Sequence, residues 1–209
     1  MKKLLIVIIS IFTVNSVLAD SPITYTNFYK AYTDVPMVQQ ALKSRGKISD
    51  VMMSYLANDT NPLDVKLAVI NAIGWSHKGI TNSTGFLNYV VKTKKYKAES
   101  NGKSISFEWY ATTDELICYA YLRAMDNYFD VIYANEIAEL ALKKNPNSFS
   151  VNMIVRLIKA QGLNLLNEDC FGYAQFNTLK TNNQLQMDMR KEAEKYIFEY
   201  MNSIGENCK

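Results

Sequence analysis

Residues 56–74 read LANDTNPLDVKLAVINAIG, and this stretch carries the clearest helix signal in the chain. Asn61 can cap a helix, and Pro62 fits its first position, where the missing N–H costs nothing. An apolar stripe follows at helical spacing and includes Val65, Ala68, Val69, Ala72 and Ile73. Gly74 is a typical residue for ending it. The sequence therefore predicts a helix with one buried face.

Most of the remaining chain has the same character. Thr112 and Glu115 have the spacing of a capping box, so a helix should begin at Thr113 and run to about Tyr128. Further helices are predicted to begin at Asp34, to cover 48–56, and to run from Asp130 to Lys144 and from Ser148 to Gln161, with an end at Gly162. A final long helix is predicted to carry one apolar face that runs from Leu185 to Ile204. The expected fold class is all-α, arranged either as an α-α helical-repeat-like array or as an irregular bundle.

Two segments depart from the helical pattern. Within 94–110, Asn101-Gly102 is a strong hairpin signal, and Ile105, Phe107 and Trp109 alternate after it. We expect a small β-hairpin inserted between helices, with an irregular exposed loop as the alternative. Residues 164–183 are polar and mixed, which predicts a loop that carries Cys170.

Two short stretches resemble helical repeats. In residues 56–74, the register of Pro62, Val65, Lys66, Ala68, Ala72 and Gly74 resembles a HEAT repeat. Residues 138–146, AELALKKNP, resemble the end of a tetratricopeptide repeat. The resemblance covers about a seventh of the predicted mature chain, with one copy of each. It implies a scaffold that binds a protein or peptide on one face.

The first 19 residues, MKKLLIVIISIFTVNSVLA, have the pattern of a secretory signal peptide. A basic start and an apolar stretch precede a small residue at Ala19, where cleavage is expected. The alternative, a membrane anchor, is disfavoured because Asn15 and Ser16 interrupt the apolar run. We therefore expect residues 20–209 to form a single, mostly helical domain in the periplasm or the secreted fraction.

The composition argues against several classes of protein. Hydrophobic residues make up 48% and charged residues 21% of the chain, which excludes a fully disordered protein. The net charge is +3, and it falls to +1 without Lys2 and Lys3 of the leader. That balance argues against an electrostatically driven nucleic-acid partner. We also expect no integral membrane segment after cleavage, and the sequence suggests no cofactor.

The three cysteines have different surroundings. Cys118 lies in an apolar run, where a buried free thiol is expected. Cys170 and Cys208 lie in polar contexts, and an oxidising compartment would allow them to pair. We hypothesise a Cys170–Cys208 disulfide, which would close a loop of about 39 residues and stabilise the fold by about 4 kcal/mol on the chain-entropy model. With one histidine, the chain has no zinc-ligand spacing.

Two residues are candidates for catalysis. His77 is the only histidine and follows a predicted helix end, where a structural role is favoured over a general base. Glu108 lies between Phe107 and Trp109, and an apolar pocket there would suit an acid catalyst. A strand would instead turn Glu108 outward. An envelope-polymer hydrolase using Glu108 or His77 is therefore kept as an alternative hypothesis.

The leading hypothesis is a non-catalytic secreted or periplasmic protein that binds a protein or peptide partner. A specific version is an immunity-type protein that neutralises a periplasmic toxin. Tyr25, Phe28, Tyr29 and Tyr32 follow helical spacing and would form one stripe, which either packs into the core or contacts the partner. Trp109 is a further candidate contact.

Overall fold

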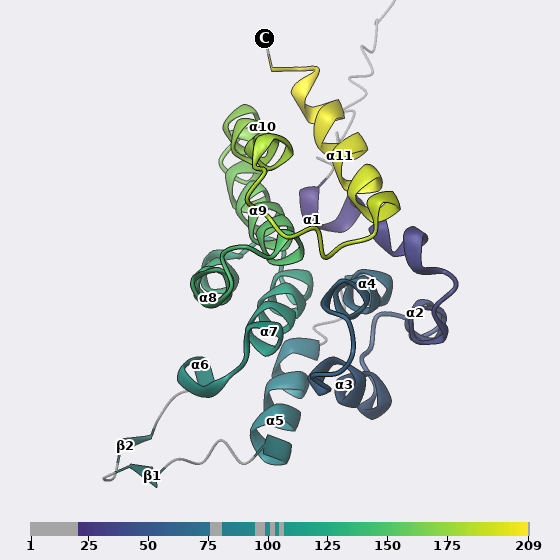
Figure 1. The fold of residues 1–209 in the computed structure, drawn as a ribbon, viewed down its shortest axis with the longest axis vertical. Helices are drawn as coiled ribbons and strands as arrows, with labels where there is room; N and C mark the ends of the chain where they lie inside the picture. The colour runs from purple at the N-terminus through teal and green to yellow at the C-terminus, as the bar shows by residue number, and fades with distance from the viewer. Residues whose placement is uncertain (1–20, 76–80, 95–98, 101–102, 105–106, 209) are drawn as a thin grey trace, which may run out of the picture.

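The computed structural model describes residues 21–75, 81–94, 99–100, 103–104 and 107–208. These residues are mostly helical, which confirms the predicted all-α class (Figure 1). The elements in chain order are α1 Pro22–Tyr25, the 3-10 helix η1 Phe28–Tyr32, α2 Pro36–Leu42, α3 Asp50–Ala57, α4 Leu63–Ile73, α5 Asn82–Lys94, β1 Glu99–Ser100, β2 Lys103–Ser104, α6 Phe107–Tyr110, α7 Thr113–Asp126, α8 Ile132–Lys144, α9 Phe149–Asn164, α10 Asp169–Asn177, the 3-10 helix η2 Thr178–Thr181, and α11 Lys191–Gly205.

Helix α7 forms the centre of the core. It contacts α3, α4, α5, α8 and α9, and every residue from Leu116 to Leu122 is buried. A helix that is covered on all sides reads as apolar all round, which explains the dense run in the sequence. The predicted capping box is confirmed. The Thr112 hydroxyl accepts from the Glu115 N–H at 3.3 Å, and a Glu115 carboxylate oxygen accepts from the Thr112 N–H at 2.8 Å.

Helix α4 begins one residue later than the proline signal predicts. Pro62 takes the N-cap position and Leu63 is the first helical residue. The predicted cap, Asn61, instead donates through its side-chain amide to the Tyr55 carbonyl at 2.8 Å, and so ties the turn back to α3. The other end is as predicted, because Gly74 has a φ of +72° and closes the helix in a conformation that disfavours side chains.

The N-terminal aromatic residues do not form one continuous helix. Helix α1 ends at Tyr25, and η1 begins at Phe28. The buried Asn71 side chain occupies the break, since it accepts from the Tyr29 N–H at 2.9 Å and donates to the Thr26 carbonyl at 3.1 Å. This segment packs on α4, α9 and α11, so the first and last described elements lie side by side (Figure 1).

The boundaries after residue 160 also differ from the prediction. Helix α9 continues through Gly162 to Asn164, and the segment expected as a loop contains α10 and η2. Gly162 therefore lies inside the helix rather than at its end, and a Cβ there would lie 3.4 Å from a methyl group of Val131. Helix α10 is anchored by buried Gly172 and Phe176.

Helix α11 begins only at Lys191, so Leu185 and Met189 precede it. The segment before Lys191 instead bonds to the start of α9. Asp188 accepts from the Ser150 N–H at 2.7 Å and from the Ser148 hydroxyl at 2.6 Å, and therefore serves the start of α9. Backbone bonds of Gln186 to Asn147 and Phe149 tie the same segment to the start of α9.

The hairpin prediction is confirmed in its position and wrong in its extent. Strands β1 and β2 pair antiparallel, with Glu99 opposite Ser104 and Ser100 opposite Lys103. Residues 107–110 are not a continuation of β2 but form the helical turn α6. Among the described helices, none combines the length and apolar character needed to cross a membrane.

Candidate partner-binding groove

Helix α6 separates two aromatic residues. Phe107 is 8% exposed, and its ring meets that of Tyr119 edge-on with centroids 5.5 Å apart. Trp109 is 79% exposed. Residues two apart on a helix point about 200° away from each other, whereas on a strand they share a face. Burial of Phe107 on a helical turn therefore directs Trp109 into solvent.

Beside Trp109 lies a groove of about 320 Å³ between α6 and the C-terminal half of α8. We call it the Trp109 groove, and it is lined by Glu108, Trp109, Leu140, Lys143 and Lys144. The accessible surface inside it is mainly apolar, although three of its five lining residues are charged. Its volume lies at the lower end of the range typical of ligand pockets, about 300–1,000 Å³.

Helix α8 fixes the position of α6 at both ends of the turn. The Lys144 ammonium donates to the carbonyls of Ala111 at 2.6 Å and Trp109 at 3.3 Å. The Tyr133 hydroxyl donates to a carboxylate oxygen of Glu108 at 3.0 Å. Burial, together with the neighbouring Glu108 carboxylate, raises the pKa of Tyr133 to about 12. The phenol thus stays protonated, and remains a donor, well above neutral pH.

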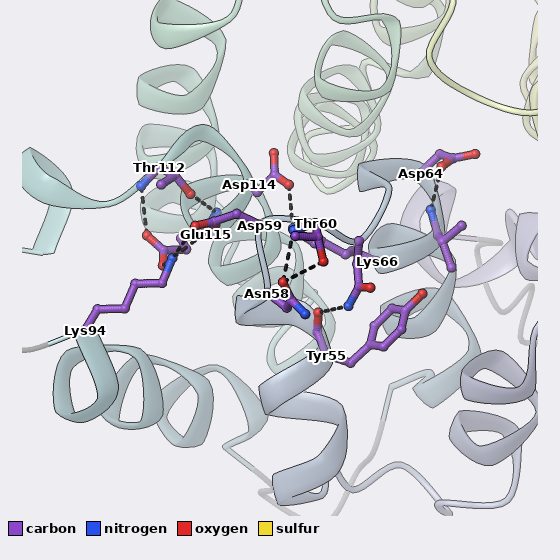
Figure 2. A network of polar contacts seen from close by, with 12 residues as sticks. Tyr55, Asn58, Asp59, Thr60, Asp64, Lys66, Lys94, Thr112, Asp114 and Glu115 are labelled. Carbon is purple, nitrogen blue, oxygen red and sulfur yellow. Dashed lines mark hydrogen bonds and ion pairs between the residues drawn. The ribbon is translucent and has the colours of Figure 1, made fainter.

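The start of α7, directly after α6, is held by three ion pairs that we call the ion-pair clamp. Lys66 of α4 lies 2.6 Å from Asp114, and Lys94 of α5 lies 2.8 Å from Glu115 and 3.0 Å from Asp59. Figure 2 shows the lysines approaching these carboxylates from separate elements. Burial works to lower the pKa of Lys94, but the Glu115 and Asp59 carboxylates together raise it above its usual value. The clamp joins α4, α5 and the α3–α4 turn to the start of α7, the helix that directly follows α6.

The four aromatic residues that the sequence placed on one stripe differ in their exposure to solvent. Phe28 and Tyr32 are fully buried and Tyr29 is half-buried, so the packing interpretation applies to them and a partner cannot reach the first two. Tyr25 is 49% exposed, and its ring stacks on Tyr200 with centroids 6.3 Å apart. Of the five candidate contacts, Trp109 is the most exposed.

Of the two candidate catalytic residues, the structure describes Glu108 but not His77. His77 lies outside the described residues. Glu108 does not alternate outward on a strand, as the pattern predicted, but is half-buried on α6 and faces Tyr133. Glu108 is the one acidic residue among the five that line the Trp109 groove, and the other two charged residues are lysines. In the described part of the chain, His, Cys, Asp and Glu side chains form no group of three or more that could hold a metal ion.

Cys170 and Cys208 are disulfide-bonded, with their Cα atoms 5.3 Å apart, so the pairing hypothesis is supported. The bond ties the first turn of α10 to a residue three positions past the end of α11. A second groove, of about 610 Å³, lies against it and includes Asn164, Glu168, Phe171 and Asn207 in its lining. Cys118 is buried as expected, and burial raises the pKa of its thiol.

The groove residues on α8 were missed by the sequence reasoning. Leu140, Lys143 and Lys144 follow i, i+3, i+4 spacing and so share one helix face, a signal that was present in the chain. Comparison with protein-family models, with curated proteins and with solved structures found no match to this chain. The resemblance to helical repeats therefore remains a prediction.

Proposed function

We propose that this chain is a non-catalytic binding protein of the periplasm or secreted fraction, and that it holds a protein or peptide partner at the Trp109 groove. The observation that carries the proposal is the exposed Trp109 side chain beside an apolar groove. Tryptophan is enriched among the residues that dominate interface energies, particularly where it lies next to a pocket.

The surroundings of Trp109 support this role because they fix the backbone that carries it before any partner arrives. Phe107 is packed in the core, Lys144 donates to the carbonyls of Trp109 and Ala111, and the ion-pair clamp anchors the start of α7. An anchor that is already ordered loses less conformational entropy on binding than a mobile one. The secreted location is supported by the leader pattern and agrees with the Cys170–Cys208 disulfide.

The test is recovery of a partner by the tagged mature protein from its native envelope or secreted fraction, quantified by mass spectrometry. Trp109→Ala should reduce the stoichiometric partner by at least about tenfold, as expected for an interface anchor. Phe171→Ala removes another exposed aromatic side chain, from α10, and should leave recovery unchanged. Equal recovery by all three proteins would reject the proposal.

Glu108→Gln distinguishes binding from the alternative of envelope-polymer hydrolysis. Glutamine keeps the size of the side chain and can still accept from Tyr133, but it cannot serve as a carboxylic acid. On our proposal the variant retains partner recovery and cellular function. Loss of the cellular phenotype with intact partner recovery would favour the hydrolase instead.

A further inference from the structure

We propose that the partner segment in the Trp109 groove is an acidic peptide, with an apolar side chain between Trp109 and Leu140 and an adjacent carboxylate on Lys143. This inference rests on the proposed function and specifies the chemistry of the partner. It follows from the distribution of apolar surface and charge around the groove.

The apolar part of the groove is formed by two side chains from different elements. Trp109 comes from α6 and Leu140 from the face of α8 that also carries Tyr133 and Lys144. A small, mainly apolar groove of this kind suits one inserted side chain rather than an extended surface. Aromatic or aliphatic anchors are the usual occupants of such pockets at interfaces.

The two lysines that line the groove, Lys143 and Lys144, differ in their contacts. Lys144 is engaged with the Ala111 and Trp109 carbonyls. Lys143 is exposed, and it forms no ion pair with any described residue. Its ammonium is therefore available to a ligand carboxylate beside the apolar groove. A complementary charge at this position would direct the approach of the partner as well as its register.

The nearby carboxylates have other partners. Glu108 accepts from Tyr133, which belongs to the first turn of α8, whereas Lys143 lies in the last turn. Glu139 is paired with Lys159 of α9 at 3.7 Å. The two lysines that line the groove thus outnumber its one carboxylate. An acidic residue is favoured at the Lys143 end and disfavoured near Glu108.

Fluorescence anisotropy with defined peptides tests this chemistry. The probe is fluorescein-Gly-Gly-Asp-Phe-Glu-Leu-Asp, compared with a neutral peptide that has Asn and Gln in place of the acids and with a Lys-substituted peptide. The acidic probe should bind the mature protein most tightly. Its affinity should fall when salt rises from about 0.05 to 0.5 M, because the lysine is exposed to screening.

Variants assign the effect to the groove. Lys143→Glu should weaken the acidic probe by about tenfold, and Lys143→Arg should preserve binding. Lys191→Glu makes the same charge change on α11 and should have little effect, which controls for net charge. Equal binding of acidic and neutral probes, no acidic-probe binding up to about 1 mM, or equal loss in both Glu variants would overturn the inference.

Failure of the inference differs from failure of the proposed function. If Trp109→Ala abolishes partner recovery while Lys143→Glu does not, the groove binds a partner whose recognition does not depend on acid groups. If Trp109→Ala leaves recovery unchanged, the groove is not the binding site at all.

Discussion

Phe107 and Trp109 are two positions apart on α6, yet one is 8% exposed and the other 79%. The relationship depends on backbone conformation, because a strand would have placed both rings on one face. The helical turn uses one aromatic residue to anchor the segment and presents the other to solvent. This division of roles has measurable consequences.

The two aromatic residues should differ sharply in their contribution to stability. Phe107→Ala removes a ring packed on Tyr119 and should lower the free energy of unfolding by about 3 kcal/mol. Trp109→Ala should change it by no more than about 0.5 kcal/mol, since it is a surface substitution. Urea unfolding followed by circular dichroism measures both. Equal losses would show that the Trp109 side chain is packed in solution.

Lys66 and Asp114 should behave as a coupled pair. The Lys66 side chain is fully buried, so Asp114→Asn would leave its charge without its carboxylate partner. Breaking a buried pair in this way costs about 3–5 kcal/mol, whereas an apolar replacement of the lysine is better tolerated. Lys66→Met combined with Asp114→Asn should therefore cost less than the sum of the single changes. Additive losses in a double-mutant cycle would contradict the coupling.

The disulfide should dominate the stability of the C-terminal helices. Cys170 and Cys208 are 38 positions apart, and the bond should contribute about 4 kcal/mol on the chain-entropy model. Reduction, or paired serine substitutions, should lower the urea midpoint accordingly. Alkylation of the native protein should label no cysteine, and denaturation without reductant should release one thiol, from Cys118. Recovery of three thiols would show that the pair is not oxidised.

Tyr133 provides a test at alkaline pH. Its folded-state pKa is about 12 against an ordinary value of 10.0, so between these values the folded protein retains a proton that the unfolded chain releases. Stability should therefore fall as the pH rises from about 10 to 12. Tyr133→Phe should show a smaller decline over that window when both proteins are unfolded in urea. Parallel pH profiles would mean that Tyr133 titrates normally.

Local signals predicted the helices well where they acted within one segment. The capping box of Thr112 and Glu115 and the closing Gly74 both form as expected, because each depends on neighbours in sequence. Predictions failed where a distant side chain supplied the hydrogen bond. Asn71 interrupts the N-terminal helix, and Asp188 caps α9 rather than belonging to α11.

The sequence predicted only part of the candidate groove, because contacts between distant segments form the rest. Trp109 and Glu108 were selected from composition and alternation, but their relation to Leu140 and Lys143 depends on how α8 packs against α6. The alternating pattern at 105–109 is also compatible with a helical turn once Phe107 is buried on Tyr119. Short apolar runs do not fix helix or strand without that tertiary contact.

Site-specific photo-crosslinking tests the central claim most directly. A photoreactive phenylalanine analogue replaces Trp109 in one protein and the exposed Phe171 in another, and each is irradiated in the native envelope or secreted fraction. Our account expects a single crosslinked partner from position 109 and none from position 171. Crosslinking from both positions alike, or from position 171 alone, would contradict a binding site at the Trp109 groove.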